Sequence, residues 1–110
     1  MGIAVLLLNL LPGLLSAIPG ISSSLKQVIT DVSGSATAVL SSGALSTPSV
    51  NTVLAAWLGI INALKADPNL PANILSAVAQ LEKAVQAALL QDVKAQAAVD
   101  WSTIVVIATV

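Results

Sequence analysis

The 110-residue chain contains no cysteine, histidine, tyrosine or arginine. Without cysteine it can form neither a disulfide nor a thiolate metal site, and its redox compartment stays undetermined. Without histidine it lacks the usual general base and the commonest metal ligand. The residue types left for catalysis are serine, threonine, lysine and the carboxylates, and the five acidic residues are scattered singly. We therefore expect no enzymatic activity, no metal and no organic cofactor.

Charged residues are also scarce, at 8% of the chain against roughly 25% in an ordinary soluble domain. The net charge is -1, and no basic face exists that could neutralise a nucleic-acid backbone. The six glycines are never clustered in a phosphate-binding pattern. Ser23 and Lys26 match a Ser-x-x-Lys spacing, but this spacing arises easily by chance in a serine-rich helix start. The sequence thus predicts no nucleic-acid partner and no small-molecule substrate.

Apolar residues, in contrast, make up 56% of the chain. Ordinary soluble domains reach only about 45 to 50% even when glycine is counted. A chain of this length forms a single domain, residues 1–110, with one core. We expect that core to be too small for all of the apolar side chains, so that copies of the same chain or a membrane must cover the remainder.

Helical periodicity and the positions of proline and glycine divide the chain into four apolar segments and a tail. The expected fold class is all-α, a small bundle of three to four helices with a hydrophobic N-terminal helix and an extended C-terminal arm. The expected elements are an apolar helix over 1–20, helices over 21–43 and 47–66, an amphipathic helix over 71–99 and an extended tail over 101–110.

The boundaries of the first two helices rest on specific residues. The first segment is apolar on every side, and Pro12 with Gly13 is expected to stop or kink it. The second begins with Ser22 or Ser23 as its N-cap and ends at Gly43. Its predicted apolar stripe comprises Ile21, Leu25, Val28, Ile29, Val32, Val39 and Leu40.

The next two helices are expected to be antiparallel neighbours. Thr47 is the predicted N-cap of the third helix, and Pro48 occupies its first helical position, where the missing N–H does no harm. The two prolines of Asp67-Pro68-Asn69-Leu70-Pro71 specify a tight connection to the fourth helix. The fourth helix is the only one with a substantial polar face.

The tail from Trp101 to Val110 is rich in β-branched residues and contains no charge, glycine or proline. Such residues favour an extended conformation. The tail should therefore pack as an extended arm or pair with another chain, and the remaining alternative is that it continues as a buried helix.

Several apolar residues are candidates for self-association rather than for chemistry. Ala55, Gly59 and Ala63 form a row of small residues that allows close approach of another helix, either within the domain or from another copy or a bilayer partner. Trp57 fits a core position, and Trp101 would pin the tail to the helices. The full set of predicted packing residues is Leu6, Leu7, Leu10, Ala55, Trp57, Gly59, Ala63, Trp101, Ile104 and Val106.

Two interpretations account for the apolar surplus. Membrane insertion is favoured by the apolar N-terminal segment and by the uncharged interval 32–64, but Pro12 interrupts the first. A helix over 48–64 would reach roughly 25 Å, short of a hydrocarbon core near 30 Å. Self-assembly would cover both the N-terminal helix and the tail. The sequence therefore predicts a self-associating structural protein whose copies form rings, tubes or filaments, with a membrane-inserted helical protein bound to lipid as the alternative.

One further indication is a resemblance. Leu64-Lys65-Ala66-Asp67-Pro68-Asn69-Leu70-Pro71 followed by Leu81-Glu82-Lys83-Ala84-Val85 resembles small uncharacterised helical proteins encoded by bacteriophages and prophages. The resemblance covers about the last 60 residues and consists of helix and turn residues, with no chemical site to carry over. It implies a viral or prophage accessory protein that is either structural or holin-like.

Overall fold

The computed structural model describes residues 2–18, 20–43 and 47–109, and within these ranges every regular element is a helix. The all-α prediction is therefore confirmed. The elements are α1 (Gly2–Ser16), α2 (Ser23–Ser42), α3 (Thr47–Lys65), α4 (Ala72–Leu89), α5 (Val93–Ala97), α6 (Trp101–Val105) and the 3-10 helix η1 (Val106–Thr109).

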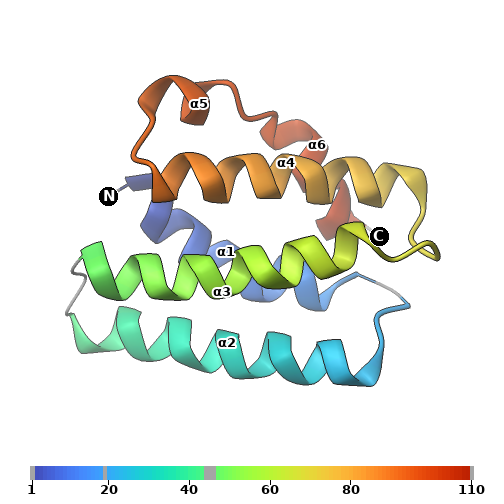
Figure 1. Cartoon of the computed structure of the whole chain (residues 1–110), viewed down its shortest axis with the longest axis horizontal. Helices are drawn as coiled ribbons and strands as arrows, with labels where there is room; N and C mark the ends of the chain where they lie inside the picture. The colour runs from blue at the N-terminus through green and yellow to red at the C-terminus, as the bar shows by residue number, and fades with distance from the viewer. Residues whose placement is uncertain (1, 19, 44–46, 110) are drawn as a thin grey trace.

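The four long helices form two layers. Figure 1 shows α2, α3 and α4 side by side in that order, with α3 running opposite to both neighbours. The expected antiparallel arrangement of α3 and α4 is thus confirmed. α1 crosses behind this layer and contacts α2, α3, α4 and η1. The short helices α5 and α6 pack on α4, on its side away from α3.

α1 continues through its proline. The helix extends from Gly2 to Ser16 with Pro12 inside it, so of the two expected effects of Pro12, a stop or a kink, the stop does not occur. A proline within a helix removes one hydrogen bond and costs about 3 kcal/mol. Burial of the apolar side of α1 against the other helices offsets this cost; its buried residues are Ala4, Leu7, Leu8, Leu11 and Leu15. Tertiary packing therefore overrides the local preference.

α2 has the predicted caps but an unexpected interior. Ser22 is the N-cap, with its Oγ accepting a hydrogen bond from the backbone N–H of Leu25, and Gly43 ends the helix in the left-handed conformation at φ 71°. The serines and threonines in the middle do not break the helix. Their hydroxyls donate to carbonyl oxygens one turn earlier, from Thr30 to Lys26, Ser33 to Ile29, Ser35 to Asp31 and Thr37 to Ser33.

The connection between α3 and α4 is fixed by polar contacts on both sides of the turn. Asp67 Oδ1 accepts a hydrogen bond of 2.9 Å from the backbone N–H of Asn69, which closes the turn locally. Lys65 Nζ lies 2.8 Å from Glu82 Oε1 and links the end of α3 to the middle of α4. At the other end of α3, Thr47 is the first helical residue, and the residue before it lies outside the described ranges.

α4 is shorter than predicted, because it ends at Leu89 instead of continuing toward residue 99. The chain turns at Gln91, whose φ of 53° is the one positive value among the described non-glycine residues. A separate short helix, α5, then begins with Asp92 as its N-cap. The sequence contains neither glycine nor proline between residues 72 and 99, so no residue signals this turn.

The expected extended C-terminal arm is not present. Residues 101–105 form α6 and residues 106–109 form η1, although β-branched residues dominate this stretch. Asp100 is the N-cap of α6, with its carboxylate accepting hydrogen bonds from Ser102 and Thr103. Ile104 and Ile107 are buried in the core. The alternative of a buried helical continuation is therefore the correct one.

One core covers most of the apolar side chains. The chain exposes 5495 Å², and a folded monomer of this mass is expected to expose about 5,600 Å². Because most of the described apolar side chains are also buried in this core or packed against it, the expectation that one core is too small is wrong for those residues. Among the described residues, the large hydrophobic side chains that stay exposed are Leu6, Leu10, Val28, Leu90 and Val105.

Candidate functional site

The structure separates the predicted packing residues into three groups. Leu7 and Trp57 have no exposed surface and Ile104 exposes only 1%, so all three belong to the core of a single chain. Trp57 therefore occupies the core position expected for it, whereas Leu7 and Ile104, expected to face another copy, pack against the helices of their own chain. Trp101 and Val106 are partly buried against the same core. Leu6, Leu10 and the row of small residues on α3 are the predicted residues that face outward.

Trp57 occupies the centre of the core. Its indole Nε1 is buried and has no hydrogen-bond partner among the described residues. A buried donor without a partner costs roughly 1 to 3 kcal/mol. The apolar ring of Trp57 therefore stabilises the fold by its packing, whereas its N–H group lowers that stabilisation.

The outer face of α1 is formed by four exposed residues spaced three or four apart, Leu6, Leu10, Gly13 and Ala17. Ala17 directly follows the last residue of the helix. Leu6 and Leu10 expose 45% and 38% of their surface. The neighbouring Asn9 turns its amide back to the helix, donating a hydrogen bond of 3.0 Å to the carbonyl of Val5. This face is apolar, and no charged residue occurs in α1.

The row of Ala55, Gly59 and Ala63 lies on the solvent side of α3. A Cβ added to Gly59 would meet no atom within 4 Å, so the absence of a side chain is not required for packing inside this chain. The interpretation that the row serves helix packing within the domain is therefore wrong for these residues. Because these three side chains are small and uncharged, the surface of the α2–α3–α4 layer carries no long side chain at these positions.

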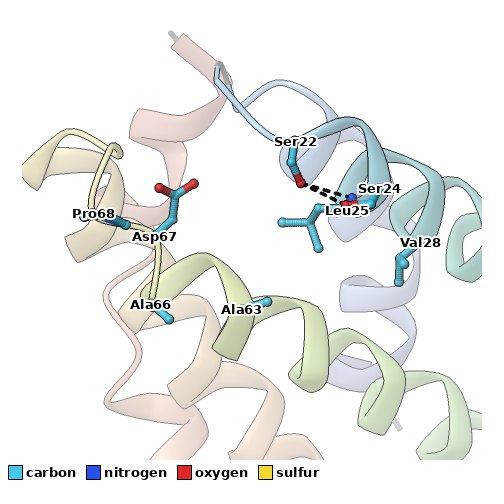
Figure 2. A pocket seen from close by; sticks show the side chains of 8 residues that line it. All are labelled: Ser22, Ser24, Leu25, Val28, Ala63, Ala66, Asp67 and Pro68. Carbon is cyan, nitrogen blue, oxygen red and sulfur yellow. Dashed lines mark hydrogen bonds between the residues drawn. The ribbon is translucent and has the colours of Figure 1, made fainter.

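An open groove lies between the N-terminal half of α2 and the C-terminal end of α3 (Figure 2). Its volume is about 420 Å³, and its lining residues are Ser22, Ser24, Leu25, Val28, Ala63, Ala66, Asp67 and Pro68. The serine hydroxyls contact each other and the Leu25 N–H, and the Asp67 carboxylate is used by its own turn. Its polar groups therefore serve as caps, and the groove has no arrangement of nucleophile and base. The sequence placed Val28 on the buried stripe, but 44% of it is exposed.

The C-terminal segment is tied to α4 by two polar contacts. The backbone N–H of Asp100 donates to Gln80 Oε1 over 3.1 Å, and Lys83 Nζ donates to the carbonyl oxygen of Ala98 over 3.2 Å. Hydrogen bonds from the side chains of Ser102 and Thr103, and from the Thr103 backbone, lower the pKa of Asp100 to about 2. These hydrogen bonds also cap α6, so the lowered pKa and the start of the helix have the same cause.

Acidification is expected to weaken this cap. Because the pKa of Asp100 is about 2 in the folded chain and 3.8 for an ordinary aspartate, its carboxylate stabilises the fold above about pH 4. That contribution is lost as the pH falls through this window. Asp100→Asn keeps a capping oxygen but cannot titrate. Its free energy of unfolding, measured by denaturant titration, should fall less between about pH 5 and pH 2 than that of the wild type. Equal losses in the two proteins would contradict this role.

The described residues offer little for other chemistry. They contain no group of three or more acidic side chains placed to hold a metal ion. None of the described helices combines the length and the apolar character needed to cross a bilayer. Comparison with protein-family models, with curated proteins and with solved structures found no match to this chain. The interpretation of function therefore depends on the surface of the molecule itself.

Proposed function

We propose that the protein is a non-enzymatic structural component that self-associates, with the outer face of α1 contacting a second copy. The observation that carries this proposal is the pair of exposed leucines, Leu6 and Leu10, one turn apart on a helix without any charged residue. The resemblance of residues 64–85 to small helical phage proteins supports placing this role in a bacteriophage or prophage.

The charge distribution favours a second copy over a membrane surface as the partner. No charged side chain precedes Lys26 in the sequence, so two α1 faces can pair without desolvating an ion or opposing like charges. Helices that bind a bilayer surface usually carry lysine or arginine on their polar face. α1 carries neither.

The magnitude of this contact is small. Complete burial of a leucine contributes about 1.5 to 3 kcal/mol, so covering the exposed part of Leu6 or Leu10 contributes about 1 kcal/mol each. A symmetric pair of faces buries four such side chains, which contributes about 4 kcal/mol. Association costs roughly 4 to 15 kcal/mol in lost translational and rotational freedom and side-chain ordering. The four leucines therefore offset only the lower end of this cost, so even a weak contact needs further surface around them.

Charging this face should abolish the association. In the double variant Leu6→Lys with Leu10→Lys, four like charges would meet in a symmetric contact, so the sedimentation coefficient should no longer rise with protein concentration. Val28→Lys is the matched control, because Val28 is exposed to the same extent, 44% against 45% for Leu6, but lies on α2. Analytical ultracentrifugation of the wild type and both variants measures the effect, and circular dichroism checks that each is folded.

Two outcomes would overturn the proposal. The first is a wild type whose sedimentation coefficient does not change with concentration, or a double variant that associates as the wild type does. The second is binding of the wild type to neutral phosphatidylcholine vesicles, lost in the double variant, without self-association. That result would establish a lipid surface as the partner of this face.

A further inference from the structure

The turn after α4 has the hydrogen bonds of a Schellman motif. The backbone N–H of Asp92 donates to the carbonyl of Ala87 over 2.9 Å, and the N–H of Gln91 donates to that of Ala88 over 3.2 Å. The central residue of the turn, Gln91, has a φ of 53°. This left-handed position is usually occupied by glycine, because other residues meet a steric conflict there.

The same residues are compatible with a straight helix. The sequence between residues 72 and 99 contains no glycine or proline, and its apolar periodicity predicts one continuous helix. Leucine and glutamine, which occupy positions 90 and 91, are good helix formers. The bent form is therefore stabilised by the docking of residues 93–109 together with the hydrogen bonds of the turn, and a helix that joined α4 to α5 would relieve the conflict at Gln91.

The segment after the turn, residues 93–109, is a unit of its own. It packs on α4 and, through η1, on α1, with Ile104 and Ile107 in the core. The hydrogen bonds from Ser102 and Thr103 to Asp100 lie inside the segment, so they would move with it. Its polar contacts to α4 include the bonds made by Asp100 and Ala98.

We propose that residues 93–109 of one copy dock on α1 and α4 of a second copy, in a reciprocal domain-swapped dimer whose residues 90–92 are helical. The docking surface and its occupant are both visible in the folded chain, and the exchanged segment reproduces the same contacts from a neighbour. If the turn straightens, the segment extends beyond the end of its own α4. Leu90, at this end of α4, is 78% exposed, so no packed side chain has to be removed at this position. The two left-handed Gln91 conformations are relieved on exchange.

This inference rests on the proposed self-association and names the segment that provides most of its area. The α1 face covers the equivalent of two half-exposed leucines per copy, whereas the exchanged segment brings two fully buried isoleucines and the partly buried Trp101 onto the partner. Because the exchanged segment makes the same contacts on the partner as on its own chain, the exchange buries no additional charged group. The α1 contact can then form in addition, between swapped dimers.

Two variants change the hinge in opposite directions. Gln91→Gly removes the steric conflict in the bent turn and lowers the helix propensity of the straight form. Because each dimer contains two such turns, both effects count twice. The dimerisation constant should therefore fall about tenfold or more. Asp92→Ala removes the N-cap that Asp92 provides to Ala95 only in the bent form, and should raise that constant about fivefold or more. Asp92→Asn retains a capping oxygen and is the matched control.

The measurement is refolding from guanidinium at high protein concentration, followed by size-exclusion chromatography with light scattering. An isotope-filtered NOE experiment on a dimer mixed from labelled and unlabelled chains then identifies the contact. Exchange predicts intermolecular NOEs from the methyl groups of Ile104 and Ile107 to those of α4. A dimer without these NOEs, or a dimer fraction that Gln91→Gly leaves unchanged, overturns the exchange.

The two proposals fail separately. The double variant Leu6→Lys with Leu10→Lys should keep the exchanged dimer, whereas Gln91→Gly should keep the weak α1 contact. A wild type and an Asp92→Ala variant that both stay monomeric after concentrated refolding contradict the exchange. If the wild type still shows concentration-dependent sedimentation that the lysine substitutions abolish, the proposed function stands without it.

Discussion

Deleting residues 104–110 should leave the chain largely unfolded. Ile104 and Ile107 are both buried, and removing a buried isoleucine side chain typically costs about 2 to 5 kcal/mol. The two together, about 4 to 10 kcal/mol, are comparable with the lower part of the roughly 5 to 15 kcal/mol by which a domain of this size is stable. Helical circular dichroism and the midpoint of guanidinium unfolding should both collapse in the truncated protein.

Alanine substitutions in the same segment distinguish the loss of buried side chains from the loss of chain length. Ile104→Ala with Ile107→Ala should lower the free energy of unfolding by about 4 to 10 kcal/mol. Val105→Ala, in the same segment but 54% exposed, should change it by less than about 0.5 kcal/mol. A truncated chain with wild-type helicity would show that the segment is a detachable arm, as the sequence predicted.

Replacing Trp57 by alanine should cost about 3 to 5 kcal/mol, since its side chain is fully buried and leaves a large cavity. Trp57→Phe should cost less, about 1 kcal/mol or below. The smaller ring loses some packing, but the variant also loses the buried Nε1–H that has no partner among the described residues. Urea unfolding of both variants measures the two free energies. Equal destabilisation by Phe and Ala would show that the N–H makes a stabilising hydrogen bond.

The sequence predicts the long helices well where caps and periodicity agree. Ser22 and Gly43 bound α2 as expected, and the proline-containing turn at residues 67–71 places α3 and α4 antiparallel. These signals are local, and the structure follows them because nothing in the tertiary packing opposes them. The hydroxyl-rich middle of α2 remains helical, and its Thr30, Ser33, Ser35 and Thr37 hydroxyls each donate to a carbonyl one turn earlier without interrupting the helix.

The C-terminal third could not be predicted from local preference. β-branched residues favour extended structure, yet residues 101–109 are helical because the Asp100 cap and the burial of Ile104 and Ile107 against α4 and α1 outweigh that preference. The turn at Gln91 likewise has no glycine to announce it. Both features depend on contacts between segments far apart in the sequence.

The sequence predicts that α1 is an apolar helix, but it does not predict which side of the helix faces outward. Because the helix is apolar on every side, periodicity does not tell which leucines face the core, and Leu6, Leu7 and Leu10 were all expected to contact another copy. The structure buries Leu7 and exposes the other two. The signal that could have resolved this is Asn9, a polar residue that borders the face of Leu6 and Leu10 and is exposed like them. A charge at Leu7 would therefore test the core and not the surface.

The back-bonded hydroxyls of α2 alter how its surface interacts with water. Thr30, Ser35 and Thr37 are exposed, but each already donates its hydrogen to a carbonyl of the preceding turn. A hydroxyl in this state needs water only as a hydrogen-bond donor to its lone pairs, so removing that water sacrifices fewer hydrogen bonds than the composition suggests. The serine- and threonine-rich side of α2 is consequently less hydrophilic than its composition suggests, because dehydrating it breaks only the hydrogen bonds that water donates to these oxygens.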